Sequence, residues 1–107
     1  MKKKFGFTML IAIMAVVLLA GTALAHTALF SCWDNGDGTV SCEGGYSDGS
    51  SAAGTTINVA DGGGNVTFSG KLDKFGQLTI KKPAGEYSVT FDGGPGHSVT
   101  VNGKDIK

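Results

Sequence analysis

Two histidines carry the clearest capacity for chemistry in this 107-residue chain, because imidazole nitrogens are common ligands of transition metals. His26 directly follows Ala23, Leu24 and Ala25, a small-x-small sequence typical of a signal-peptidase site. Cleavage after Ala25 makes His26 the first residue, so that a free α-amine stands beside its imidazole. These two nitrogens can chelate one metal ion. His26 is therefore the first candidate ligand, and His97 is the second.

One amine and two imidazoles form a three-nitrogen set, a histidine brace, which suits Cu(II) or Ni(II) in geometry and ligand type. Asp48 and Asp92 are candidates to orient an imidazole N–H as second-shell partners or to add an oxygen ligand. Amines titrate near about 8 and imidazoles near about 6.5, so we expect metal affinity to fall below about pH 6. Two alternatives stay open: His26 as a remnant of cleavage, and His97 as an ordinary exposed hairpin residue.

The first 25 residues predict a secretory signal peptide containing a signal helix. Three lysines at positions 2–4 precede an apolar run over residues 7–20, and the cleavage site follows. The run is shorter than the roughly 20 residues of a spanning helix, and no cysteine directly after it offers a lipid anchor. We therefore expect cleavage, membrane contact only through this segment before cleavage, and a periplasmic or secreted location.

Residues 26–107 are long enough for one small domain, whose limited core is often reinforced by a disulfide or a metal. This part holds six lysines, no arginine and nine acidic residues, a net charge of about −3. Without a basic patch to neutralise phosphates, nucleic-acid binding is not expected. Abundant glycine and the Thr, Val, Ile, Phe and Tyr at apolar positions indicate an all-β domain.

Cys32 and Cys42 predict a disulfide, because an exported chain reaches an oxidising compartment. Residues 28–33 and 39–42 read as two strands around a turn at 34–38, so the bridge would span a hairpin. Closing this loop contributes about 3 kcal/mol in the chain-entropy model. Thiolate metal ligation is the rival interpretation, but it usually shows closer cysteine spacing.

Seven short strands with turn signals between them predict a small β-sandwich. After the first hairpin, a surface loop is expected over residues 43–54, then strands over 55–60, 65–70 and 77–82. Two more strands follow, with Tyr87, Val89 and Phe91 on one face of the sixth and Val99 and Val101 on one face of the seventh. If the strands alternate in direction, His26, Asp48 and His97 fall at one end of the sandwich.

One motif resembles the transthyretin-like and carboxypeptidase-regulatory-like sandwiches: Asp73-x-x-Gly76-x-Leu78-x-Ile80, followed by Gly85-x-Tyr87-x-Val89-x-Phe91. It looks like the central hairpin of that family. The resemblance implies a seven-stranded Ig-like or transthyretin-like sandwich over residues 26–107. It says little about function, because this fold hosts many functions.

A second resemblance is to small periplasmic accessory proteins associated with energy-coupling-factor cobalt/nickel transporters. It is carried by His26 and by three stretches: Phe30-x-Cys32, Cys42-Glu43-Gly44-Gly45-Tyr46-Ser47-Asp48-Gly49-Ser50 and Phe91-Asp92-x-Gly94-Pro95-Gly96-His97. It implies capture of Ni(II) or Co(II) outside the cytoplasm and delivery to a membrane metal transporter. The usual amino-terminal copper/nickel motif has histidine third, where this chain has Ala28, which favours a brace.

The sequence therefore predicts an exported binding protein for Ni, Co or Cu that assists metal uptake or homeostasis. The alternative is a metal-free β-sandwich that acts as an interaction or structural module of the cell envelope. An enzyme is not expected, because no carboxylate pair lies in a recognisable catalytic setting and no serine lies in a nucleophile elbow. Copper oxygenases of polysaccharides also use a brace, but they are larger and present a flat aromatic face.

Overall fold

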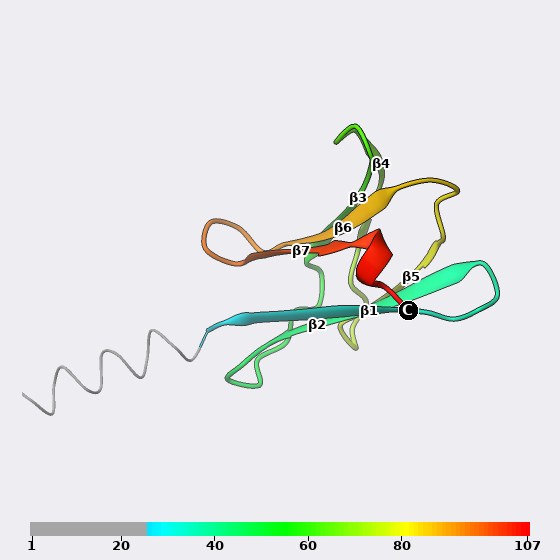
Figure 1. Cartoon of the computed structure of the whole chain (residues 1–107). Helices are drawn as coiled ribbons and strands as arrows, with labels where there is room; N and C mark the ends of the chain where they lie inside the picture. Colours follow the sequence, from blue (N-terminus) through cyan, green and yellow to red (C-terminus); the bar gives the residue numbers. More distant parts are fainter. Residues whose placement is uncertain (1–25) are drawn as a thin grey trace, which may run out of the picture.

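A computed structural model describes residues 26–107; the predicted signal peptide and its helix lie outside the described residues. The described chain is almost entirely β-structure (Figure 1). Its elements are β1 (Ala28–Asp34), β2 (Thr39–Tyr46), β3 (Thr56–Asp61), β4 (Val66–Lys71), β5 (Gln77–Lys81), β6 (Tyr87–Asp92), β7 (Ser98–Asn102) and the 3₁₀ turn η1 (Gly103–Asp105). Within this part of the chain, no helix has the length and apolar character needed to cross a membrane.

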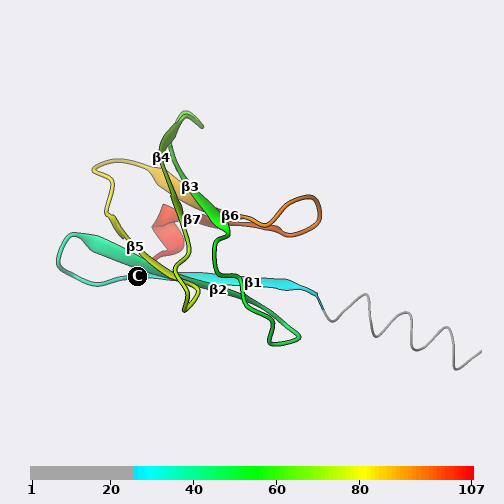
Figure 2. The same cartoon turned by 180° about the vertical axis from the view of Figure 1, so that it is seen from behind.

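The strands form two antiparallel sheets, one of three strands in the order β1-β2-β5 and one of four in the order β4-β3-β6-β7. Figures 1 and 2 show the two sheets from opposite sides. The predicted all-β, seven-stranded sandwich is confirmed. The core lies between the sheets, and its fully buried side chains are Val40, Cys42, Ile57, Val59, Val89 and Phe91.

Strands β5 and β6 were expected to pair as a hairpin, and this expectation is wrong. β5 pairs with β2, whereas β6 pairs with β3 and β7 in the other sheet. Ile80 on β5 and Val89 on β6 are both buried in the same core cluster. The two strands therefore contribute to one core from different sheets, and the connection that includes Pro83 crosses between the sheets.

The predicted disulfide between Cys32 and Cys42 is confirmed, and the two residues lie directly opposite each other in the β1–β2 ladder. The loop predicted over residues 43–54 begins later than expected, because β2 continues to Tyr46. Gly44 explains the difference: a Cβ there would lie 2.8 Å from Phe91 Cε2. This glycine marks a close approach between the sheets rather than a flexible loop.

Three segments lie together at one end of the sandwich, which we call the histidine end: the start of β1, the loop 47–55 and the loop 93–97. In Figure 1 this end is on the left, and the reverse view of Figure 2 places the same segments together on the right. The turn between β1 and β2 and the connection from β5 to β6 lie on the other side. The antiparallel order of the strands thus brings residues from both sheets to the histidine end.

Candidate metal site

The β1–β2 ladder continues past its last strand pair, Ala28 and Tyr46, and carries His26 to a defined position. Ser47 N donates to Thr27 O at 2.9 Å, and Thr27 N donates to Ser47 Oγ at 3.1 Å. Side chains on one face of a strand recur every second residue. The pair after Ala28 and Tyr46 on that face is therefore His26 and Asp48. Their side chains do meet, with His26 Nδ1 2.9 Å from Asp48 Oδ2.

The Asp48 carboxylate is held in place by the tight turn that follows β2. Gly49 N donates to Tyr46 O at 2.9 Å, and Gly49 adopts a left-handed φ of 84°. Ser50 donates twice to Asp48 Oδ1, from its hydroxyl at 2.6 Å and from its backbone N at 2.9 Å. These hydrogen bonds, with a smaller contribution from His26, lower the pKa of Asp48 below its ordinary value. An ionised carboxylate therefore faces His26 with Oδ2.

Tyr46 links this corner to the core and to the second histidine. Its side chain lies on the same face of β2 as Cys42, two positions beyond Gly44. The ring makes edge contacts with Phe91, at 6.0 Å between centroids, and with His97, at 5.9 Å. The Tyr46 ring thus lies between the core and the histidine end and contacts one residue of each.

His97 is placed by a glycine-rich turn between β6 and β7. His97 N donates to Gly94 O at 2.9 Å, and Gly93 N donates to His97 O at 3.1 Å. A Cβ on Gly93 would lie 2.7 Å from His97 O, so this position requires glycine. His97 Nδ1 lies 3.3 Å from Pro95 O. Because a carbonyl oxygen only accepts, this contact is a hydrogen bond in the tautomer that carries hydrogen on Nδ1, which leaves the Nε2 lone pair for another partner.

His26 and His97 line one pocket of about 200 Å³, together with Tyr46, Ser50 and Gly93. The His26 side chain is 60% exposed, so it is accessible to an ion from solution. Among residues 26–107, no three His, Cys, Asp or Glu side chains converge closely enough to hold a metal. A brace needs only two such side chains, because its third nitrogen is the α-amine that cleavage would free.

The other predicted partner, Asp92, is engaged in a different contact. Its Oδ1 accepts from Gly94 N at 3.3 Å, which holds the turn that carries His97. Neither Asp92 nor Asp48 lines the pocket of the two histidines. Asp48 contacts His26 directly, whereas within residues 26–107 Asp92 makes no hydrogen bond or ion pair with either histidine side chain. Asp92 thus acts on His97 only through the backbone of the loop.

The sequence indicated Asp48 as a possible partner of an imidazole but not that His26 is the histidine it meets, and it did not indicate the anchoring role of Ser50. A signal was nevertheless present. Once Cys32 pairs with Cys42, stepping two residues at a time along both strands leads to His26 opposite Asp48. Ending the second strand at Cys42 hid this relation.

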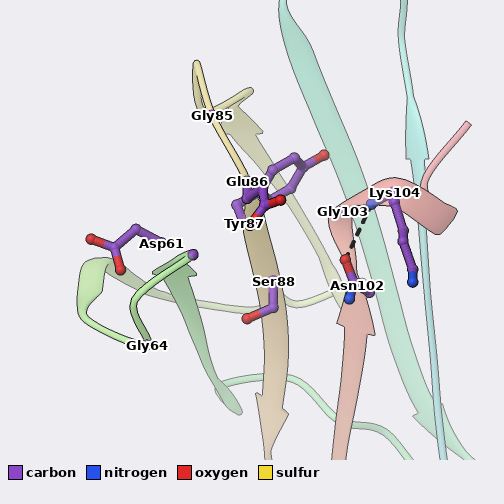
Figure 3. Close-up of a pocket in the computed structure, with 10 residues that line it drawn as sticks. Asp61, Gly64, Gly85, Glu86, Tyr87, Ser88, Asn102, Gly103 and Lys104 are labelled. Atoms are coloured by element: carbon purple, nitrogen blue, oxygen red, sulfur yellow. Dashed lines mark hydrogen bonds between the residues drawn. The ribbon is translucent and has the colours of Figure 1, made fainter.

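A larger pocket, of about 710 Å³, lies away from the histidines and is lined by Asp61, Glu86 and Lys104 among others (Figure 3). Two of its polar side chains hold the backbone: Asp61 Oδ1 accepts from Gly63 N, and Asn102 Oδ1 accepts from Lys104 N. The pocket contains no histidine or cysteine. It does not compete with the histidine end as a transition-metal site.

Comparisons of the chain with protein-family models, with curated proteins and with solved structures found no match. The chemistry of His26, Asp48 and His97 is therefore the basis for assigning a function.

Proposed function

We propose that this protein is an exported transition-metal-binding protein that assists metal uptake or homeostasis, with a binding rather than a catalytic role. The observation that carries the proposal is the shared pocket of His26 and His97. The two residues come from opposite ends of the domain sequence and from different sheets. A shared metal ion would explain why His26 and His97 line the same pocket.

The proposed donors are the α-amine and Nδ1 of His26, which close a chelate ring, and Nε2 of His97. The contact between His97 Nδ1 and Pro95 O supports this choice, because metal-binding histidines commonly donate their other ring N–H to a carbonyl or carboxylate. Nitrogen donors in a tetragonal arrangement favour Cu(II) and Ni(II). Co(II) binds such sites more weakly in the general order of divalent-metal affinities.

We infer a periplasmic or secreted location from the signal-peptide pattern of residues 1–25, and the disulfide fits an oxidising compartment. The resemblance to proteins associated with cobalt/nickel transporters makes a membrane metal transporter the proposed partner. A net charge of about −3 on residues 26–107 favours the approach of cations.

The test is calorimetric titration of Ni(II), Co(II) and Cu(II) into protein that begins at His26. The matched control begins at Ala25, which keeps every side chain of the site but moves the amine by one residue. Micromolar or tighter binding that the control weakens at least tenfold is expected, and His97→Ala should weaken it too. Equal and weak binding by the two forms would contradict the proposal.

An interaction module of the cell envelope is the second candidate, and a different feature supports it. Strands β4 and β5 are edge strands of the two sheets, and an apolar cleft of about 540 Å³ is lined by Val59, Phe68 and Ile80 among others. Phe68 is 47% exposed, which is high for a side chain directed towards a core. This reading becomes the better one if the titration finds no amino-terminal metal site.

A further inference from the structure

Resting on the proposed metal function, we propose that Asp48 is itself a metal ligand. It forms a half-site with the amine and Nδ1 of His26, onto which His97 closes as the last donor. The proposal follows from one contact, that of His26 Nδ1 with Asp48 Oδ2. Of the two roles expected for Asp48, second-shell partner or oxygen ligand, it selects direct coordination, and it adds an order of assembly.

The identity of the contacting nitrogen decides between these two roles. A chelate that includes the α-amine must use Nδ1, because Nε2 is too far from the amine on the same residue. Metal-bound Nδ1 carries no hydrogen, so it cannot donate to Asp48. A carboxylate beside Nδ1 must then either bind the same ion or be displaced by it.

The separation of the two atoms fits shared coordination. Two ligands at about 2.05 Å from a metal, and at right angles, are about 2.9 Å apart. His26 Nδ1 and Asp48 Oδ2 lie 2.9 Å apart. The same separation is normal for a hydrogen bond, in which the Nδ1 axis points at the oxygen, so an ion shared by the two atoms also requires the side chains to turn.

Asp48 is also organised in advance for this role. The two hydrogen bonds from Ser50 occupy Oδ1 and leave Oδ2 directed at His26. The Asp48 side chain is only 24% exposed, and the backbone contacts between Thr27 and Ser47 fix the two strands beside it. A ligand that is held before the metal arrives loses little conformational entropy on binding.

His97 differs from Asp48 because it approaches from the other sheet. His26, Asp48 and His97 do not form a ready group of three within the part of the chain that the structure describes. The half-site therefore binds first, and His97 completes it by a shift of its side chain across the pocket. The complete donor set is three nitrogens and one oxygen, which suits tetragonal Cu(II) or Ni(II).

The experiment records Cu(II) affinity and the electron paramagnetic resonance spectrum of protein that begins at His26, for the wild type and for three variants. Asp48→Asn should weaken binding at least tenfold and change the copper hyperfine pattern. Ser50→Ala removes an anchor but keeps the carboxylate, so it should weaken binding while retaining the wild-type spectrum. Asp105→Asn is the matched control, an exposed carboxylate outside the histidine pocket, and should leave the spectrum unchanged.

Wild-type affinity and spectrum in Asp48→Asn would overturn the role of Asp48. The metal function would survive that result if the chain beginning at Ala25 still binds more weakly, so the two failures are distinguishable. A readout that needs no variant is the infrared difference spectrum of metal-loaded minus metal-free wild-type protein. Coordination shifts a carboxylate stretch, and the absence of any shift would also overturn the proposal.

Discussion

His26 Nδ1 lies 2.9 Å from Asp48 Oδ2, and the two residues form the next same-face pair of the β1–β2 ladder after Ala28 and Tyr46. Further along the same face, Cys32 and Cys42 join the two strands covalently. The disulfide therefore holds the strand register on which the contact between His26 and Asp48 depends. A disturbance of the strand register would separate His26 from Asp48.

Removal of the disulfide should lower both stability and metal affinity. We expect the double variant Cys32→Ala with Cys42→Ala to lose about 3 kcal/mol of unfolding free energy, because its unfolded chain is no longer cross-linked. Urea unfolding followed by circular dichroism measures this loss. Chemically reduced wild-type protein serves as the control, and unchanged stability in both samples would contradict the prediction.

Gly44→Ala should destabilise the sandwich by about 1–3 kcal/mol, because the added methyl group overpacks the core. Its Cβ would lie 2.8 Å from Phe91 Cε2 and 2.9 Å from Leu72 Cδ1. Gly45→Ala is the matched control, since the nearest atom to its Cβ would be Ser50 O at 4.0 Å. Thermal unfolding of the two variants compares them directly, and equal midpoints would argue against the close approach at Gly44.

Tyr87→Phe should stabilise the protein, by about 1 kcal/mol. Among the side chains of residues 26–107, the Tyr87 hydroxyl is buried without a hydrogen-bond partner, and such a group carries an uncompensated desolvation cost. The ring itself is 8% exposed and stays packed in the variant. A lower unfolding midpoint would show that the hydroxyl has a favourable contact in solution. Metal affinity should not change, because Tyr87 is outside the histidine pocket.

Acid should weaken the fold only at low pH. Hydrogen bonds hold the pKa of Asp34, Asp37, Asp48 and Asp61 below the ordinary 3.8; for Asp34 the first cause is the Lys82 ammonium at 2.7 Å. A carboxyl with a lowered pKa stabilises the fold fully above its unfolded value, and this stabilisation disappears as pH falls through the folded value. The unfolding midpoint should therefore begin to fall as pH drops below about 4. A fall beginning near pH 6 would contradict this assignment.

High pH should remove the stabilisation that Lys82 contributes to the fold, because the Lys82 ammonium then loses its proton. Its hydrogen bond to Asp34 raises the pKa of Lys82 above the ordinary 10.5. The stabilisation is fully present below that ordinary value and is lost as pH rises through the higher folded value. The unfolding midpoint of the wild type should depend on pH above 10.5 because this pair is lost there. Lys82→Met should not show this part of the pH dependence. Unfolding midpoints measured from pH 9 to 12 provide the test.

As the pH is lowered, the protein should release its metal before it unfolds. Amines and imidazoles must release protons before they bind a metal, so affinity should decline below about pH 6. Between about pH 4 and 6 the protein should stay folded but release its ion. Parallel measurements of bound Cu(II) and circular dichroism distinguish this order from simultaneous loss, which would indicate that the metal leaves because the chain unfolds.

The sequence by itself determined the features that depend on neighbouring residues. The alternation of Tyr87, Val89 and Phe91 predicted the buried face of β6, and all three are buried. The pairing of Cys32 with Cys42 was predictable because the sequence contains two cysteines, so each has one possible intramolecular partner. Period-two patterns and turn residues are local, so the seven strands could be located within a few residues of their observed bounds.

The tertiary structure alone decided which strands share a sheet and which side chains meet. β5 and β6 lie in different sheets and contribute to the same core, and Gly44 in β2 lies against Phe91 of the other sheet. The placement of His97 beside Tyr46 depends on the crossing of the two sheets. Such contacts join residues far apart in the chain, and only packing of the whole core selects among the many ways to form them.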